Sequence, residues 1–185
     1  MAALGQWELG ILDWINQTFQ SNFFDKTMPW ITFLGDHGWF WILLSALLLV
    51  SKPTRKVGLT MALALLFSLI LANITLKPLV ARIRPFDLNT AVELLINAPK
   101  DFSFPSGHTQ ASFAAAAALF RYHKKAGAAA LALAALIAFS RLYLYVHYPS
   151  DVLIALIFGV LLGNLAYQAI KTLSKGYNTR KRKRR

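Results

Sequence analysis

The chain alternates long apolar segments with short polar breaks, a pattern typical of helices that cross a membrane. A transmembrane helix needs about 20 mostly apolar residues. The segments that satisfy this requirement are residues 57–76, 126–146 and 152–170. Residues 106–122 form a shorter, alanine-rich candidate, and residues 39–50 need to recruit part of the preceding segment. The pattern therefore predicts an all-α, polytopic membrane helix bundle with about five transmembrane helices.

The N-terminal segment has a different pattern. Between residues 4 and 19, tryptophan, leucine and isoleucine are interleaved with polar side chains such as Glu8, Asp13 and Asn16. We expect an amphipathic helix that lies at the membrane interface; the alternative is a sixth span. The chain is thus interpreted as a single domain. Its predicted parts are an N-terminal interfacial region (1–36), a motif-bearing core (57–170) and a basic cytoplasmic tail (171–185).

Composition narrows the class of protein further. Hydrophobic residues make up 56% of the 185-residue chain and charged residues only 15%, against about a quarter in soluble domains. There is no cysteine, which excludes disulfides and thiolate metal sites. The formal charge of +12 is concentrated near the C-terminus. A basic run after a hydrophobic segment indicates the cytoplasmic side and anionic lipid, so we expect membrane lipids and not nucleic acid as its partner.

Lysine and arginine orient the chain, because basic loops stay in the cytoplasm. The basic clusters that define this side lie at residues 52–56, 121–125 and 171–185. The loop 77–105 and the turn 145–150 then fall on the external face. That loop nevertheless carries four basic residues, Arg82 among them. Basic residues on the external side indicate a chemical role.

Three polar clusters interrupt the apolar segments, all on the predicted external face. They are Lys77-x6-Arg84-Pro85, Pro105-Ser106-Gly107-His108 and Ser140-Arg141-x5-His147-x3-Asp151. Together they supply three cations, two histidines and a carboxylate. Such a set can bind a phosphate, attack it and expel the group to which it was attached. Because each cluster ends a hydrophobic segment, the expected phosphate is carried by a lipid.

The second cluster reads as the start of a helix. Ser106 is a good N-cap, and the following amides, with Gly107 leaving room for an oxygen, form an anion site at the helix N-terminus. In the first cluster, Lys77 is a point charge and Arg84 offers a planar fork for two phosphate oxygens. Taken singly, each cluster is equally consistent with a turn or with basic side chains that reach the lipid headgroups.

The third cluster adds a nucleophile. Asp151 can accept the Nδ1–H of His147 and leave Nε2 free, which makes His147 a candidate to attack phosphorus. Arg141 lies at the end of a span, and the alternatives are an arginine at the interface, a turn histidine and an aspartate helix cap. From these residues alone, either histidine could be the attacking group.

The three clusters together resemble the signature of the type 2 phosphatidic acid phosphatase (PAP2) family, Lys-x6-Arg-Pro, Pro-Ser-Gly-His and Ser-Arg-x5-His-x3-Asp, at every position and spacing. The N-terminal stretch looks like that of short bacterial members that act on lipid phosphates. The resemblance implies a phosphatase of the bacterial cytoplasmic membrane that needs no metal and no cofactor.

The resemblance also implies the roles of the site residues. The catalytic residues would be His147 as nucleophile, Asp151 orienting it and His108 protonating the leaving oxygen. The phosphate-binding residues would be Lys77, Arg84, Ser106, Gly107 and Arg141. The expected substrate is undecaprenyl diphosphate; the alternatives are phosphatidylglycerol phosphate, lipid A 1-phosphate and phosphatidic acid. Nothing in residues 86–104 selects among them.

Rival interpretations are a vanadate-dependent haloperoxidase, whose site resembles these motifs, and a non-catalytic lipid-binding or transport protein. The five apolar segments argue against the first, and the intact histidines argue against the second. Among other polar residues, His37 beside Asp36 is a weaker candidate for substrate contact. His123 is expected on the surface. Asn73, one helical turn before Lys77, is expected to support that lysine.

Overall fold

The computed structural model describes residues 2–183 of the chain, and within them every regular element is helical. Among the described residues, three helices are long and apolar enough to cross a membrane, or four if one bent pair counts as a single span. The elements are α1 (Ala2–Phe19), α2 (Asn22–Phe33), η1 (Asp36–Gly38), α3 (Trp39–Val50), α4 (Arg55–Ser68), η2 (Leu69–Leu76), α5 (Lys77–Val80), α6 (Pro85–Leu88), α7 (Gly107–Tyr122), α8 (Lys124–Tyr143) and α9 (Pro149–Lys183). The all-α prediction is confirmed, whereas the count of about five spans is not.

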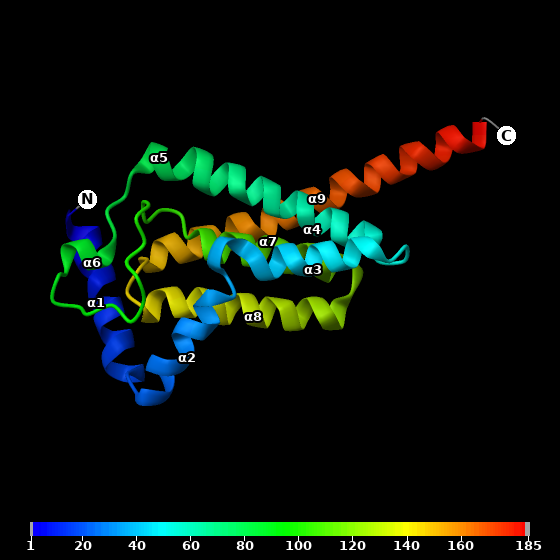
Figure 1. The fold of residues 1–185 in the computed structure, drawn as a ribbon. Coiled ribbons are helices and arrows are strands. Elements are labelled where there is room, and N and C mark those ends of the chain that lie inside the picture. Colours follow the sequence, from blue (N-terminus) through cyan, green and yellow to red (C-terminus); the bar gives the residue numbers. More distant parts are fainter. Residues whose placement is uncertain (1, 184–185) are drawn as a thin grey trace.

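Helix α7 lies at the centre of the bundle and packs against α4, α8 and α9 (Figure 1). It has 16 residues, and the alanine run Ala114–Ala118 is buried within it. Small side chains let neighbouring backbones approach closely, as membrane bundles require. Gly159 and Gly163 of α9 face α7 so closely that a Cβ atom on either would lie under 3 Å from its backbone oxygens. These small residues bring the motif at the start of α7 close to the motif at the start of α9.

The expected span at residues 39–50 belongs to a broken helix. Helices α2 and α3 are separated by the turn η1 and meet at an angle of 43°. His37 and Gly38 adopt positive φ angles of 51° and 69° in this turn, the left-handed region that suits glycine. The break places Asp36 beside the N-terminal part of α7.

The motif-bearing parts of the chain gather at one end of the bundle. Figure 1 shows α1, α6 and the turn between α8 and α9 at the end where the chain starts, whereas the α3–α4 and α7–α8 connections and the last turns of α9 lie at the opposite end. The chain passes into this end through η2, a π-helical segment that follows α4 and precedes Lys77. The site therefore draws on several separate elements.

Candidate active site

A cavity of about 1350 Å³ opens between the α2–α3 pair and the α4–η2 segment. Its polar end is lined by six of the eight site residues that the motifs predict. These are Lys77, Arg84, Gly107, His108, Arg141 and His147. The two others, Ser106 and Asp151, are fully buried behind the lining.

Lys77 and Arg84 share one carboxylate. Asp101, in the loop before α7, accepts hydrogen bonds from the Lys77 ammonium and, at 2.6 Å, from the Arg84 guanidinium. Partial burial raises the pKa of Asp101, but the two cations outweigh this effect and hold the pKa well below its usual range. Asp101 is half exposed, and its contacts show that the two cations can bind one anionic group together.

Arg141 is the most buried cation of the site. One of its terminal nitrogens donates to the Thr32 hydroxyl of α2, but its Nε has no hydrogen-bond partner within the described residues. A buried guanidinium donor without a partner is costly. Since Arg141 lines the cavity, its guanidinium charge can act on an anion bound there.

His147 is fully buried in the turn between α8 and α9. Its Nε2 lies 3.3 Å from the Arg84 guanidinium, and its Nδ1 lies 3.5 Å from the Ser103 hydroxyl and 3.6 Å from Oδ2 of Asp151. The direct Nδ1–Asp151 hydrogen bond predicted from the sequence is therefore not formed; Ser103 instead donates to Asp151 at 2.6 Å. Burial lowers the pKa of His147 well below its usual value, and the charges of Arg84 and Arg141 lower it further. The ring is thus held in the neutral form that can attack phosphorus.

His108 is held by a carboxylate that no motif contains. Its Nε2 lies 2.7 Å from Oδ1 of Asp36, at the break between α2 and α3. The neighbouring Gly35 permits this approach, because a Cβ atom there would lie 2.6 Å from Cδ2 of His108. A paired imidazole with its carboxylate partner is suited to give and take a proton.

Gly107 and Ser106 form the start of α7 as predicted. The Ser106 hydroxyl accepts a hydrogen bond from the Thr109 amide, which confirms the N-cap but leaves that amide unavailable to a ligand, contrary to expectation. A Cβ atom on Gly107 would lie 3.2 Å from Oδ1 of Asn73 and 3.8 Å from Nζ of Lys77. Gly107 thus keeps open the space beside Lys77, and Asn73 lies against this turn.

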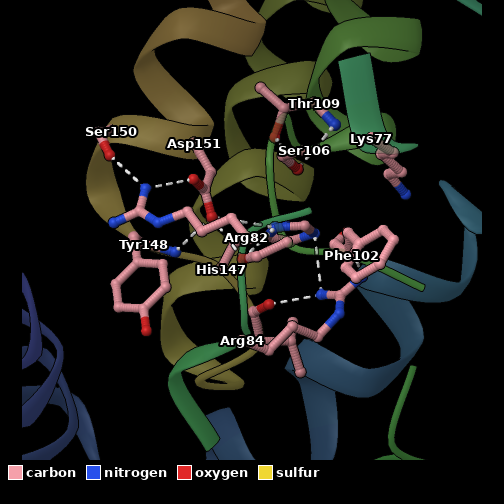
Figure 2. Close-up of polar contacts among 12 residues, drawn as sticks. Lys77, Arg82, Arg84, Phe102, Ser106, Thr109, His147, Tyr148, Ser150 and Asp151 are labelled. Carbon is pink, nitrogen blue, oxygen red and sulfur yellow. Dashed lines mark hydrogen bonds and ion pairs between the residues drawn. The ribbon is translucent and has the colours of Figure 1, made fainter. Parts of the chain in front are cut away.

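Besides the hydroxyls of Thr32 and Ser103, charged residues outside the signature contact the site: Asp36, Asp101 and Arg82. Figure 2 shows the Arg82 guanidinium directed at Ser150 and Asp151, behind the His147 ring. Of these residues, Arg82 alone carried a signal in the sequence, as a cation on the external side. His37 also lines the cavity, and its contact with substrate stays a prediction. His123 is exposed at the opposite end, as expected.

Comparison with known proteins agrees with this geometry. The model of the PAP2 superfamily matches residues 57–175. An undecaprenyl-diphosphatase of Sulfolobus acidocaldarius is 33% identical over 145 residues, which cover 77% of this chain and 70% of the relative.

Two solved structures share the fold. The crystal structure of Aquifex aeolicus LpxE superposes with a TM-score of 0.76 at 28% identity, covering 86% of this chain and 94% of that one. The structure of a transmembrane PAP2-type phosphatidylglycerolphosphate phosphatase from Bacillus subtilis superposes with a TM-score of 0.74 at 25% identity. The match covers 97% of this chain and 88% of that one. The chain therefore belongs to the PAP2 superfamily and is a multi-pass membrane phosphatase, a hydrolase that acts on phosphate esters.

Proposed function

We propose that the chain hydrolyses undecaprenyl diphosphate to the monophosphate at the external face of a bacterial cytoplasmic membrane. The observation that carries this proposal is one cavity with two chemically different parts. The three cations and two histidines of the motifs line its inner end, and apolar side chains of α3 and α4 line much of the rest. A phosphate on a long hydrocarbon chain matches both parts.

The apolar part of the cavity has the character needed for a lipid chain. Ile42 and Leu49 of α3 line one side of it, and Leu65, Leu66 and Leu69 of the α4–η2 segment line the other. Several of these side chains are also exposed on the outside of the protein, where lipid surrounds a membrane helix. A lipid phosphate can thus enter from the bilayer with its headgroup leading.

The chemistry follows from the neutral state of His147. Its Nε2 attacks phosphorus, the bond from phosphorus to the leaving phosphate oxygen breaks, and His108 donates a proton to that oxygen. A water molecule then attacks the phosphohistidine, and the neutral His108 accepts the water proton. The three cations stabilise the negative charge that builds on the phosphoryl oxygens in each transition state.

In this scheme the carboxylates have distinct tasks. Asp36 holds the His108 ring in place, and Asp151 stabilises the His147 imidazolium that forms during attack. Asp101 contacts Lys77 and Arg84 in the free enzyme. The incoming phosphate displaces Asp101 and takes over both contacts.

The name of the Sulfolobus relative, undecaprenyl-diphosphatase, supports this choice of substrate. The named activity of the Bacillus neighbour, on phosphatidylglycerolphosphate, supports that lipid as the second candidate. Phosphatidic acid and lipid A 1-phosphate follow. The phosphatase names of these two proteins favour a catalytic function over a haloperoxidase or a non-catalytic lipid-binding or transport protein.

The substrate assignment is tested with purified protein in detergent and EDTA. Phosphate release is measured from undecaprenyl diphosphate, phosphatidylglycerol phosphate, phosphatidic acid and lipid A 1-phosphate at matched concentrations. We expect the highest kcat/KM for undecaprenyl diphosphate. A higher value for a glycerolipid would replace the substrate, and a requirement for Mg²⁺ would contradict the mechanism.

A further inference from the structure

The polar face of α1 lies against the segment that carries the nucleophile. Glu8 accepts a hydrogen bond from the Ser150 amide at 3.0 Å, Asp13 accepts one from the Tyr145 hydroxyl at 2.7 Å, and Asn16 donates to the Tyr143 carbonyl at 3.3 Å. These acceptors and donors are more than 120 residues away from α1 in the chain. Helix α1 therefore contacts the His147 turn through these polar side chains and through the buried Ile15, whereas its tryptophans Trp7 and Trp14 stay exposed.

Glu8 is the key residue of this contact because it is buried, with only 4% of its surface exposed. It forms an ion pair with the Arg82 guanidinium. The same guanidinium pairs with Oδ1 of Asp151, donates to the Ser150 hydroxyl at 2.7 Å and stacks at 3.8 Å over the Tyr148 ring. One planar fork thus joins a carboxylate of α1 to the carboxylate that faces His147. Figure 2 shows its contact with Asp151.

The second oxygen of Asp151 is also fixed. Oδ2 accepts hydrogen bonds from the Ser103 hydroxyl at 2.6 Å and from the Tyr148 amide at 3.0 Å, and it is the Asp151 oxygen that lies 3.6 Å from Nδ1 of His147. With both oxygens bound, the plane of the carboxylate cannot rotate freely. Arg82 therefore decides which oxygen faces the histidine.

We propose that α1 is a positioning element for the nucleophile, acting through Glu8 and Arg82. Glu8 orients the Arg82 guanidinium, and Arg82 orients Asp151 toward His147. This inference rests on the proposed role of His147 as the attacking group. A buried ion pair on its own contributes little to stability, so the main consequence of the Glu8–Arg82 pair is a fixed geometry at Asp151.

The test compares Glu8→Gln with the matched control Gln17→Ala, an exposed position on the same helix. Glutamine keeps the size of Glu8 but removes the charge that orients Arg82.

For each full-length variant we measure kcat, the inhibition constant of inorganic phosphate and thermal stability. We expect kcat of Glu8→Gln to fall by about 10- to 100-fold, the range typical when an outer partner of an active-site ligand is removed. The phosphate inhibition constant should stay unchanged, because Lys77, Arg84 and Arg141 are untouched. Thermal stability is expected to fall, because removing one partner of a buried ion pair leaves the other charge uncompensated.

The outcomes separate this inference from the proposed function. If Glu8→Gln retains the kcat of the control while His147→Ala is inactive, the inference is overturned and the function stands. If kcat and phosphate inhibition weaken together with stability, α1 is merely structural and the inference also fails. Should Glu8→Gln not fold, Arg82→Lys gives the same decision, since lysine keeps the charge but lacks the fork. An active His147→Ala would instead overturn the proposed function.

Discussion

At the scale of single residues, Arg84 helps to keep His147 neutral. Burial is the main cause of the lowered pKa of His147, and the charge of Arg84 is the next. The Arg84 guanidinium lies 3.3 Å from Nε2 of the ring. The neutral ring is the attacking form, so activity is lost as the pH falls through this lowered pKa. We predict that the acid limb of the kcat/KM profile lies below pH 6.5, the usual pKa of histidine.

Substitution Arg84→Met removes one cause of the lowered pKa. The acid limb of the remaining activity should therefore move to higher pH. Wild type and variant are compared with the same lipid substrate, so that the ionisation of the substrate cancels. An acid limb that stays in place, or moves to lower pH, would show that His147 is not the group that titrates.

Asp101 is predicted to compete with phosphate. It contacts both Lys77 and Arg84, and Asp101→Asn removes the negative charge while keeping the shape. Inorganic phosphate should then inhibit about two- to fivefold more strongly, because an exposed ion pair is worth at most about 1 kcal/mol. Glu93→Gln, an exposed carboxylate of the same loop, is the control. Weaker inhibition of Asp101→Asn by phosphate would mean that Asp101 aligns the two cations for the ligand.

The signature predicted which residues meet in the cavity, but not how their charges are balanced. Spacing along the chain identified Lys77, Arg84 and His147 because the chemistry needs those residue types in that order. Asp36 and Asp101 were missed because they reach their partners across 72 and 24 residues. Such pairs arise from packing and leave no periodic pattern in a single sequence. Ser106 lies behind the cavity as a helix cap, so its role in phosphate binding stays a prediction.

At the scale of elements, close packing of α7 against α9 brings the second and third motifs together. A Cβ atom on Gly163 would lie 2.5 Å from the Ala114 carbonyl oxygen and 2.9 Å from the Ala117 Cβ. We predict that Gly163→Ala lowers the free energy of unfolding by about 1–3 kcal/mol, the usual cost of overpacking. Thermal unfolding of the purified protein measures this loss. The control is Gly10→Ala, where a Cβ atom meets nothing within 4 Å; equal stability of both variants would refute the packing.

Hydrophobic periodicity predicted the long helices well but misjudged the irregular ones. Residues 57–76 and 152–170 fall within helical segments that are long and apolar enough to span a membrane. The 43° break between α2 and α3 and the π-helical η2 were not predicted. Both depend on local backbone geometry that apolar composition does not encode. Helix α1 was predicted from its amphipathic pattern, but its polar side binds the His147 turn, a contact that composition alone could not indicate.

At the scale of the whole molecule, the orientation in the membrane stays a prediction from the basic loops. The α3–α4 and α7–α8 connections share the end opposite the site (Figure 1), which agrees with a cytoplasmic location for both. Because the sequence has no cysteine, single introduced cysteines can be labelled without background from native thiols. Asn97→Cys should react with a membrane-impermeant maleimide in intact cells, or in spheroplasts where an outer membrane intervenes. Lys124→Cys should react only after lysis, and the reverse pattern would invert the topology.

The account as a whole depends on a covalent intermediate at His147. The most direct measurement incubates the purified protein with undecaprenyl diphosphate labelled on its terminal phosphate, in EDTA, and quenches in alkali during turnover. Mass spectrometry of the digest should find an acid-labile phosphate on His147, and His147→Ala should show neither this label nor turnover. A label on another residue, or turnover by His147→Ala near the wild-type rate, would contradict the account.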